Sequence, residues 1–142
     1  MIIKAKANGL DLFTHSEAVK DTAFIFNAKG GFNLDSNIIY WMCIMHDLGK
    51  ANPLFQNNMV MQDFSKVCRH EISSILFIDI IPSEIKDIVA LSVLSHHKSI
   101  NNDNRSLKVL LDNHENIVFK HHINNIEKWG KSVQKYMLLW QI

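Results

Sequence analysis

The chain has 142 residues and a formal net charge of +1 at pH 7, with 47% hydrophobic and 20% charged residues. We expect a single domain, residues 1–142, with one hydrophobic core; the composition excludes wholesale disorder and the charge excludes a strongly basic nucleic-acid arm. Because no apolar run approaches the ~18 residues of a membrane span, no signal-peptide pattern is present, and two cysteines are too few for a disulfide framework, we expect a cytoplasmic protein with no membrane partner.

The spacing of apolar residues predicts one helix after another, so the expected fold class is all-α. Five glycines and two prolines are too few for an all-β chain, which needs frequent turns. The predicted helices cover about 15–28, 36–47, a short helix from 53, 70–81, 84–97, 106–113 and 118–142, with a polar loop at 98–105. The second of these is apolar nearly all round and should be buried at the centre of a helical bundle.

Capping residues set the predicted helix boundaries. The predicted start signals are Thr14 with Glu17 as a capping box, Asp35 with Ser36, Asn52 with Pro53, and Ser83. The predicted stop signals are Gly30 with Gly31, Gly49, and Pro82.

Five of the eight histidines lie at ends of the predicted helices, and one aspartate stands beside them. These residues are His15, His46, Asp47, His70, His96 and His97. Helix ends in a bundle can converge on one point. Imidazole and carboxylate together suit divalent transition metals such as Mn, Fe, Ni or Co, with Zn less favoured, whereas Mg and Ca sites are built mostly from oxygen ligands. A single buried histidine is more often a hydrogen-bonded core residue than a ligand, but the set as a whole predicts a metal site.

The doublet of His46 and Asp47 indicates how two ions could be bound. Neighbouring residues on a helix point ~100° apart, so two adjacent ligands can reach two different ions. A carboxylate can also bridge two metals, and a pair of ions is one known arrangement for phosphoester cleavage. His96 and His97 repeat the doublet at another helix end.

The same residues carry a resemblance to a known family. The run His46-Asp47-Leu48-Gly49-Lys50 matches the HD-x-G-K signature of HD-superfamily phosphohydrolases. The segments KAKANGLDLFTHSEAV, HDLGKANPLFQ, RHEISS and LSHHK, in this order over about residues 1–98, resemble the HD nuclease domain of type I CRISPR systems. In that family the domain stands alone or is fused ahead of a helicase.

The resemblance implies an all-α HD-domain bundle with metal at converging helix ends, acting as a metal-dependent nuclease on single-stranded DNA in CRISPR antiviral defence. It implies that His15, His46 and Asp47 bind one divalent transition ion. It also implies that Asp47 bridges to a second ion, which is held by His70, His96 and His97. It implies that Lys50 faces the scissile phosphate. The implied partners are single-stranded DNA, a separate or fused CRISPR helicase, and the crRNA surveillance complex.

One departure from the family concerns a later aspartate, which completes the shell of the first ion. Asp112 is the only aspartate after the polar loop, and it stands too early for that position. We expect either a truncated or minimal domain that lacks the family's C-terminal part, or an incomplete first metal site.

In the mechanism that we expect, hydroxide attacks the phosphodiester, with Asp47 and Lys50 as the catalytic residues and no protein nucleophile. Two alternatives stay open at this stage. One is an HD phosphohydrolase acting on nucleotides, and the other is a non-catalytic HD module, which the absent aspartate favours. Metal analysis and assays on DNA and on nucleotides separate the three.

Overall fold

The computed structural model describes residues 2–63, 68–97, 133–134 and 137–138, and the structural statements below concern this part of the chain. Its regular elements are α1 (Leu12–Gly30), α2 (Ser36–Met45), η1 (Leu48–Ala51), α3 (Pro53–Met61), α4 (His70–Ile75), η2 (Ile78–Ile80) and α5 (Lys86–Ser95), where η denotes a 3₁₀ helix. The only pairing of extended backbone within these residues is an isolated bridge between Lys4 and Asp11. The all-α prediction is confirmed.

The first helix begins earlier than the capping box predicts. Asp11 is its N-cap and accepts a hydrogen bond from the backbone N–H of Thr14 at 2.9 Å. Thr14 is therefore inside the helix, and its predicted capping role is wrong. The predicted stop is confirmed, because Gly31 has a φ of 65° and its N–H donates to the carbonyl of Asn27.

The second helix begins as predicted but ends sooner. Asp35 accepts hydrogen bonds from the N–H groups of Asn37 and Ile38. The helix ends at Met45, where Asp47 leaves helical geometry with a φ of −111°, so Gly49 is not its stop signal. Residues 46 and 47 thus form the link between α2 and η1 rather than the last helical turn.

The predicted helix over 70–81 is divided into α4 and η2. The hydroxyls of Ser73 and Ser74 donate to the carbonyls of Arg69 and His70, four residues back, a pattern that weakens and bends helices. After Ile75 the backbone bonds tighten to three-residue spacing, so the helix ends before Pro82 is reached.

Two further start signals have different outcomes. Asn52 caps α3 through a bond from the N–H of Leu54, and Pro53 occupies the first turn, as predicted. Ser83 does not cap α5; it lies in a turn that closes with the N–H of Ile85 on the carbonyl of Pro82, and the helix begins only at Lys86. Most of the two last predicted helices lies outside the described residues, but 133–134 and 137–138 are helical.

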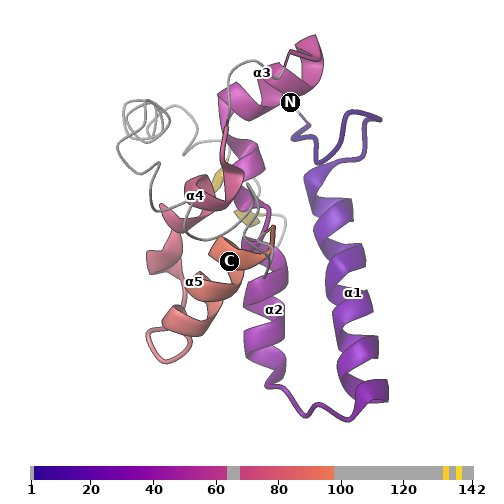
Figure 1. Cartoon of the computed structure of the whole chain (residues 1–142), viewed down its shortest axis with the longest axis vertical. Coiled ribbons are helices and arrows are strands. Elements are labelled where there is room, and N and C mark those ends of the chain that lie inside the picture. The colour runs from indigo at the N-terminus through magenta and orange to yellow at the C-terminus, as the bar shows by residue number, and fades with distance from the viewer. Residues whose placement is uncertain (1, 64–67, 98–132, 135–136, 139–142) are drawn as a thin grey trace, which may run out of the picture.

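The helices are arranged so that α2 lies between α1 on one side and α5 on the other, with α4 against both α5 and η1 (Figure 1). The core includes the fully buried side chains Leu12, Ile44, Leu48, Val89 and Val93, which come from α1, α2, η1 and α5. Within the described residues no helix is both long and apolar enough to cross a membrane. This packing places the C-terminal ends of α2 and α5 beside the start of α4.

Candidate metal centre

Four elements deliver the histidines that the sequence singles out. His15 lies on α1, His46 and Asp47 follow α2, His70 is the first residue of α4, and His96 and His97 follow α5. Because α4 and α2 both contact α5, these ends meet as expected. The structure brings together all six predicted ligands and Lys50.

Asp47 is the centre of the cluster and is 2% exposed. Its Oδ2 atom lies 3.0 Å from the Nε2 of His15 and 3.3 Å from the Nε2 of His46. Its Oδ1 atom lies 3.1 Å from the Nε2 of His70 and 3.6 Å from the Nε2 of His96. One carboxylate therefore faces two groups of histidines, one with each oxygen.

Lys50 also meets this carboxylate. Its Nζ donates a hydrogen bond to the Oδ2 of Asp47 at 2.6 Å, and its backbone N–H donates to the Asp47 carbonyl at 2.8 Å. The ammonium group lies 5.9 Å from the ring centroid of Phe55, and the Phe55 and His70 rings meet edge to face with their centroids 5.5 Å apart. A positive charge thus lies beside the histidine cluster, on its Oδ2 side.

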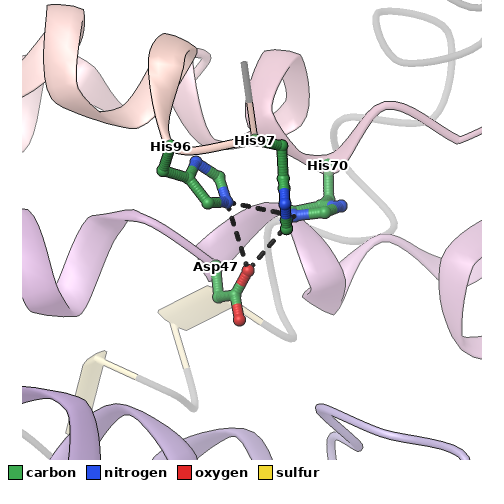
Figure 2. Close-up of side chains that lie close together, drawn as sticks. All are labelled: Asp47, His70, His96 and His97. Atoms are coloured by element: carbon green, nitrogen blue, oxygen red, sulfur yellow. Dashed lines mark hydrogen bonds and ion pairs between the residues drawn. The ribbon is translucent and has the colours of Figure 1, made fainter. Parts of the chain in front are cut away.

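The second group of histidines is drawn in Figure 2. The Nε2 of His70 lies 3.3 Å from the Nε2 of His96 and 3.0 Å from the Nε2 of His97. All three rings thus turn the same kind of nitrogen toward Asp47 and toward one another.

Hydrogen bonds on the far side of the rings fix which nitrogen carries the proton. The Nδ1 of His46 lies 2.7 Å from the carbonyl oxygen of Cys43, and the Nδ1 of His96 lies 2.6 Å from that of Val93. Because a carbonyl oxygen only accepts, each Nδ1 is the N–H donor, and each neutral ring presents an unprotonated Nε2 to the cluster. This is the arrangement that metal-binding histidines require.

The cluster fits a bound cation on two further grounds. The Oδ1 of Asp47 is buried and has no hydrogen-bond partner in the structure, although a buried carboxylate oxygen needs one. Nitrogen lone pairs that face one another and a carboxylate repel, and a metal ion between them turns that repulsion into coordination. Two donor sets share the carboxylate: His15, His46 and Asp47, and Asp47, His70, His96 and His97, each with ligand atoms within 4.8 Å of one another.

The surroundings keep the donors in the form that binds metal. Burial alone would raise the pKa of the Asp47 carboxyl, but the His46, His70 and His96 side chains around it outweigh burial and hold the pKa well below its usual range. Burial, opposed by the charge of Asp47, lowers the pKa of His15. Burial and the neighbouring histidines lower the pKa of His97 to about 4, so this ring is neutral at pH 7.

A family model described as the HD domain matches residues 12–129, which is most of the chain. The chain belongs to the HD domain family. Its all-helical HD domain carries the His/Asp cluster between helices, and the protein is a metal-dependent phosphohydrolase of this family. Comparison with curated proteins and with solved structures found no match to either.

The glycine of the HD-x-G-K signature has a packing role in this HD domain. The N–H of Gly49 donates to the hydroxyl of Ser74 at 2.7 Å, which joins η1 to α4. A Cβ atom at position 49 would collide with the carbonyl of His70 and the backbone of Ser74. Glycine therefore lets α4 approach closely enough for His70 to reach Asp47.

Three residues that support the site were not singled out as functional from the sequence: Phe55, Gln56 and Glu71. Glu71 is 4% exposed, with its Oε2 3.9 Å from the Nδ1 of His70 and its Oε1 3.1 Å from the Nε of Arg69. Gln56 accepts from the N–H of Lys4 and donates to the carbonyls of Lys4 and Lys50. Glu71 stands next to a predicted ligand in the sequence, which is the one signal that could have found it. Asp112 lies outside the described residues.

Proposed function

We propose that this HD domain is a metal-dependent nuclease that cleaves single-stranded DNA in CRISPR antiviral defence. The observation that carries the proposal is the sharing of Asp47 by two donor sets, because a bridged pair of ions suits in-line cleavage of a phosphodiester. The nuclease assignment within the HD family is supported by the four sequence segments that resemble the CRISPR branch.

The donor atoms indicate which ions the site would hold. His15, His46 and Asp47 would hold one ion, and Asp47, His70, His96 and His97 would hold another. Sets rich in imidazole nitrogen favour Mn, Fe, Ni or Co over Mg. When bound, such ions lower the pKa of water toward ~7 and neutralise charge on the phosphate.

The chain's own residues do the remaining work in this proposal. The two oxygens of Asp47 face different donor sets, Oδ2 toward His15 and Oδ1 toward His70, and the carboxylate so fixes the spacing between the two sets. The Lys50 ammonium lies beside the Oδ2 of Asp47, where it can attract a phosphate and neutralise charge that develops on its non-bridging oxygens. Burial of the carboxylate excludes bulk water from it, and the neighbouring histidine side chains keep it ionised in spite of that burial.

The proposed partners follow from the substrate. A nuclease for single strands needs unpaired DNA, so we propose that a CRISPR helicase, separate or fused, supplies the strand, and that the crRNA surveillance complex selects the target.

The test is an assay of the purified chain with Mn²⁺ or Ni²⁺, on circular single-stranded DNA and separately on a panel of nucleotides. We expect cleavage of the circle, which only an endonuclease can open, and no release of phosphate from nucleotides. Asp47→Ala should abolish cleavage, whereas Asp21→Ala, which changes an exposed aspartate on α1, should leave it intact.

Two outcomes would contradict the proposal. Hydrolysis of nucleotides with intact DNA would make the protein a nucleotide phosphohydrolase of the same family. Absence of bound transition metal, together with no cleavage under any ion, would make it a non-catalytic HD module.

A further inference from the structure

We propose that a groove along α1 binds the bases of the single strand next to the scissile phosphate. The inference rests on the nuclease function proposed above. The groove has a volume of about 500 Å³ and is lined by His15, Ala18, Val19, Thr22, Ala23 and Phe26. It begins at His15, one of the predicted metal ligands, and leads away from the cluster along one helix.

The lining residues follow one face of α1, because positions 15, 18, 19, 22, 23 and 26 are spaced by three or four. At 1.5 Å per residue, the path from His15 to Phe26 is ~16 Å long. A groove of this length, with its start at the metal centre, suits a polymer that continues beyond the reacting phosphate better than a single nucleotide.

The chemistry of the groove favours the faces of bases over their edges. Apart from His15, Thr22 is the one polar residue among those that line it, and its hydroxyl already donates to the carbonyl of Ala18 at 2.8 Å. Base edges would find little to pair with, so we expect no sequence preference. Base faces are free in a single strand and stacked in a duplex, so the groove selects single strands.

An aromatic pair stands at the far end of the groove. Phe26 is 66% exposed and Phe32 is 54% exposed, and their rings are stacked with centroids 5.2 Å apart. Exposed aromatic rings are the surfaces on which proteins stack successive bases without reading sequence. We therefore assign Phe26 as the residue that stacks a base of the substrate.

Charge at the other end of the groove matches a phosphate backbone. The Lys50 ammonium and the Nε2 of His15 both lie within 3.0 Å of the Oδ2 of Asp47, so a cation stands where the groove meets the metal centre. A strand with one phosphate at this point and its bases along α1 satisfies both the charged end and the apolar wall.

The test is binding of a fluorescein-labelled 12-nucleotide dT strand to the whole chain in EDTA, measured by fluorescence anisotropy. We expect Phe26→Ala to weaken binding about tenfold and Phe26→Tyr, which keeps the ring, to restore it. Ile25→Ala is the matched control, because Ile25 is 56% exposed on the same helix but does not line the groove. A 12-mer of abasic sites should bind weakly, and equally to both Phe26→Ala and wild type.

Several results would overturn this assignment. They are equal binding by the Phe26→Ala and Ile25→Ala variants, equal affinity of wild type for dT and abasic strands, or tighter binding of a 12-base-pair duplex. A change of oligomeric state in Phe26→Ala with unchanged DNA binding would make the patch a protein interface instead.

A second substrate separates this proposal from the nuclease function. Bis(p-nitrophenyl) phosphate is too small to fill the groove, so with Mn²⁺ we expect Phe26→Ala, compared with Ile25→Ala, to lower the ratio of DNA cleavage to hydrolysis of this small substrate about tenfold. If no phosphodiester is cleaved but Phe26 still governs DNA binding, the nuclease function fails and the groove stands. If wild type and Phe26→Ala cleave DNA equally, the proposed role of the groove is wrong and the nuclease function stands.

Discussion

Gly49 and His70 are in such close contact that the carbonyl of His70 occupies the space of a side chain at position 49. The contact joins η1, which carries the signature lysine, to the first turn of α4. The distance between Asp47, which precedes η1, and His70, which begins α4, therefore depends on position 49 having no side chain.

Gly49→Ala should destabilise the fold by about 3 kcal/mol, because the new methyl group meets backbone atoms that cannot swing away. It should also move His70 and reduce binding of metal to the set that contains it. Urea unfolding and a metal titration measure the two effects. Gly30→Ala is the control, since its Cβ would meet only the exposed ring of Phe32 and should change stability by about 1 kcal/mol or less. Equal effects of the two variants would contradict the packing role of Gly49.

The sharing of Asp47 predicts a pattern of metal loss. His15→Ala should remove one ion and leave the other, and His70→Ala should do the reverse. Asp47→Ala should remove both, because both donor sets include it. Elemental analysis after dialysis against Mn²⁺ or Ni²⁺ gives the stoichiometry of each variant. Retention of one ion by Asp47→Ala would show that the sets bind independently and that the carboxylate does not bridge.

How far the sequence predicts this molecule can be judged from particular residues. Asp35 and Asn52 cap their helices as predicted, because each bonds to N–H groups two or three residues away and needs nothing from the rest of the fold. The predicted cap Thr14 is wrong because the helix begins one turn earlier, at Asp11, whose backbone pairs with Lys4 in the folded chain. The break after Ile75 depends on serine bonds that pattern alone does not reveal.

Some residues of the candidate site could likewise be predicted from the sequence, and others could not. The histidines and Asp47 were found because a motif and helix ends mark them, and the structure brings them together. Their roles as ligands remain predictions that the metal titrations test. Gln56 and Glu71 lie in the segments HDLGKANPLFQ and RHEISS that carry the resemblance, but no role was predicted for either, because what distinguishes each is a contact made only in the folded chain.

Stability at high pH should depend on Cys43. Burial raises the pKa of this thiol from 9.0 to about 11, because the folded chain disfavours the thiolate. The contribution of the protonated Cys43 thiol to the free energy of unfolding is fully present below pH 9 and is lost as the pH rises through 11. About 2 kcal/mol of it should be lost by pH 10.5. Wild type should therefore lose its stability advantage over Cys43→Ala between pH 8 and pH 10.5, measured by urea unfolding. A constant difference across this range would contradict the pKa shift.

Gln56 should hold the N-terminal segment against the loop that carries Lys50. Its side-chain amide accepts from the N–H of Lys4 at 2.9 Å and donates to the carbonyls of Lys4 and Lys50 at 2.8 and 2.7 Å. Gln56→Ala should cost about 2–3 kcal/mol, since three hydrogen bonds are lost.

Gln56→Glu is the sharper test of the same contact. A carboxylate keeps the size of the amide and can still accept from Lys4, but it cannot donate, and it would face two carbonyl oxygens. It should therefore destabilise the fold at least as much as alanine, and more above pH 5 than below it, because protonation of the new carboxyl restores one donor. Asn57→Ala, an exposed change on the same helix, should be nearly neutral. Should Gln56→Glu unfold like the Asn57 control, the three bonds would not anchor the segment.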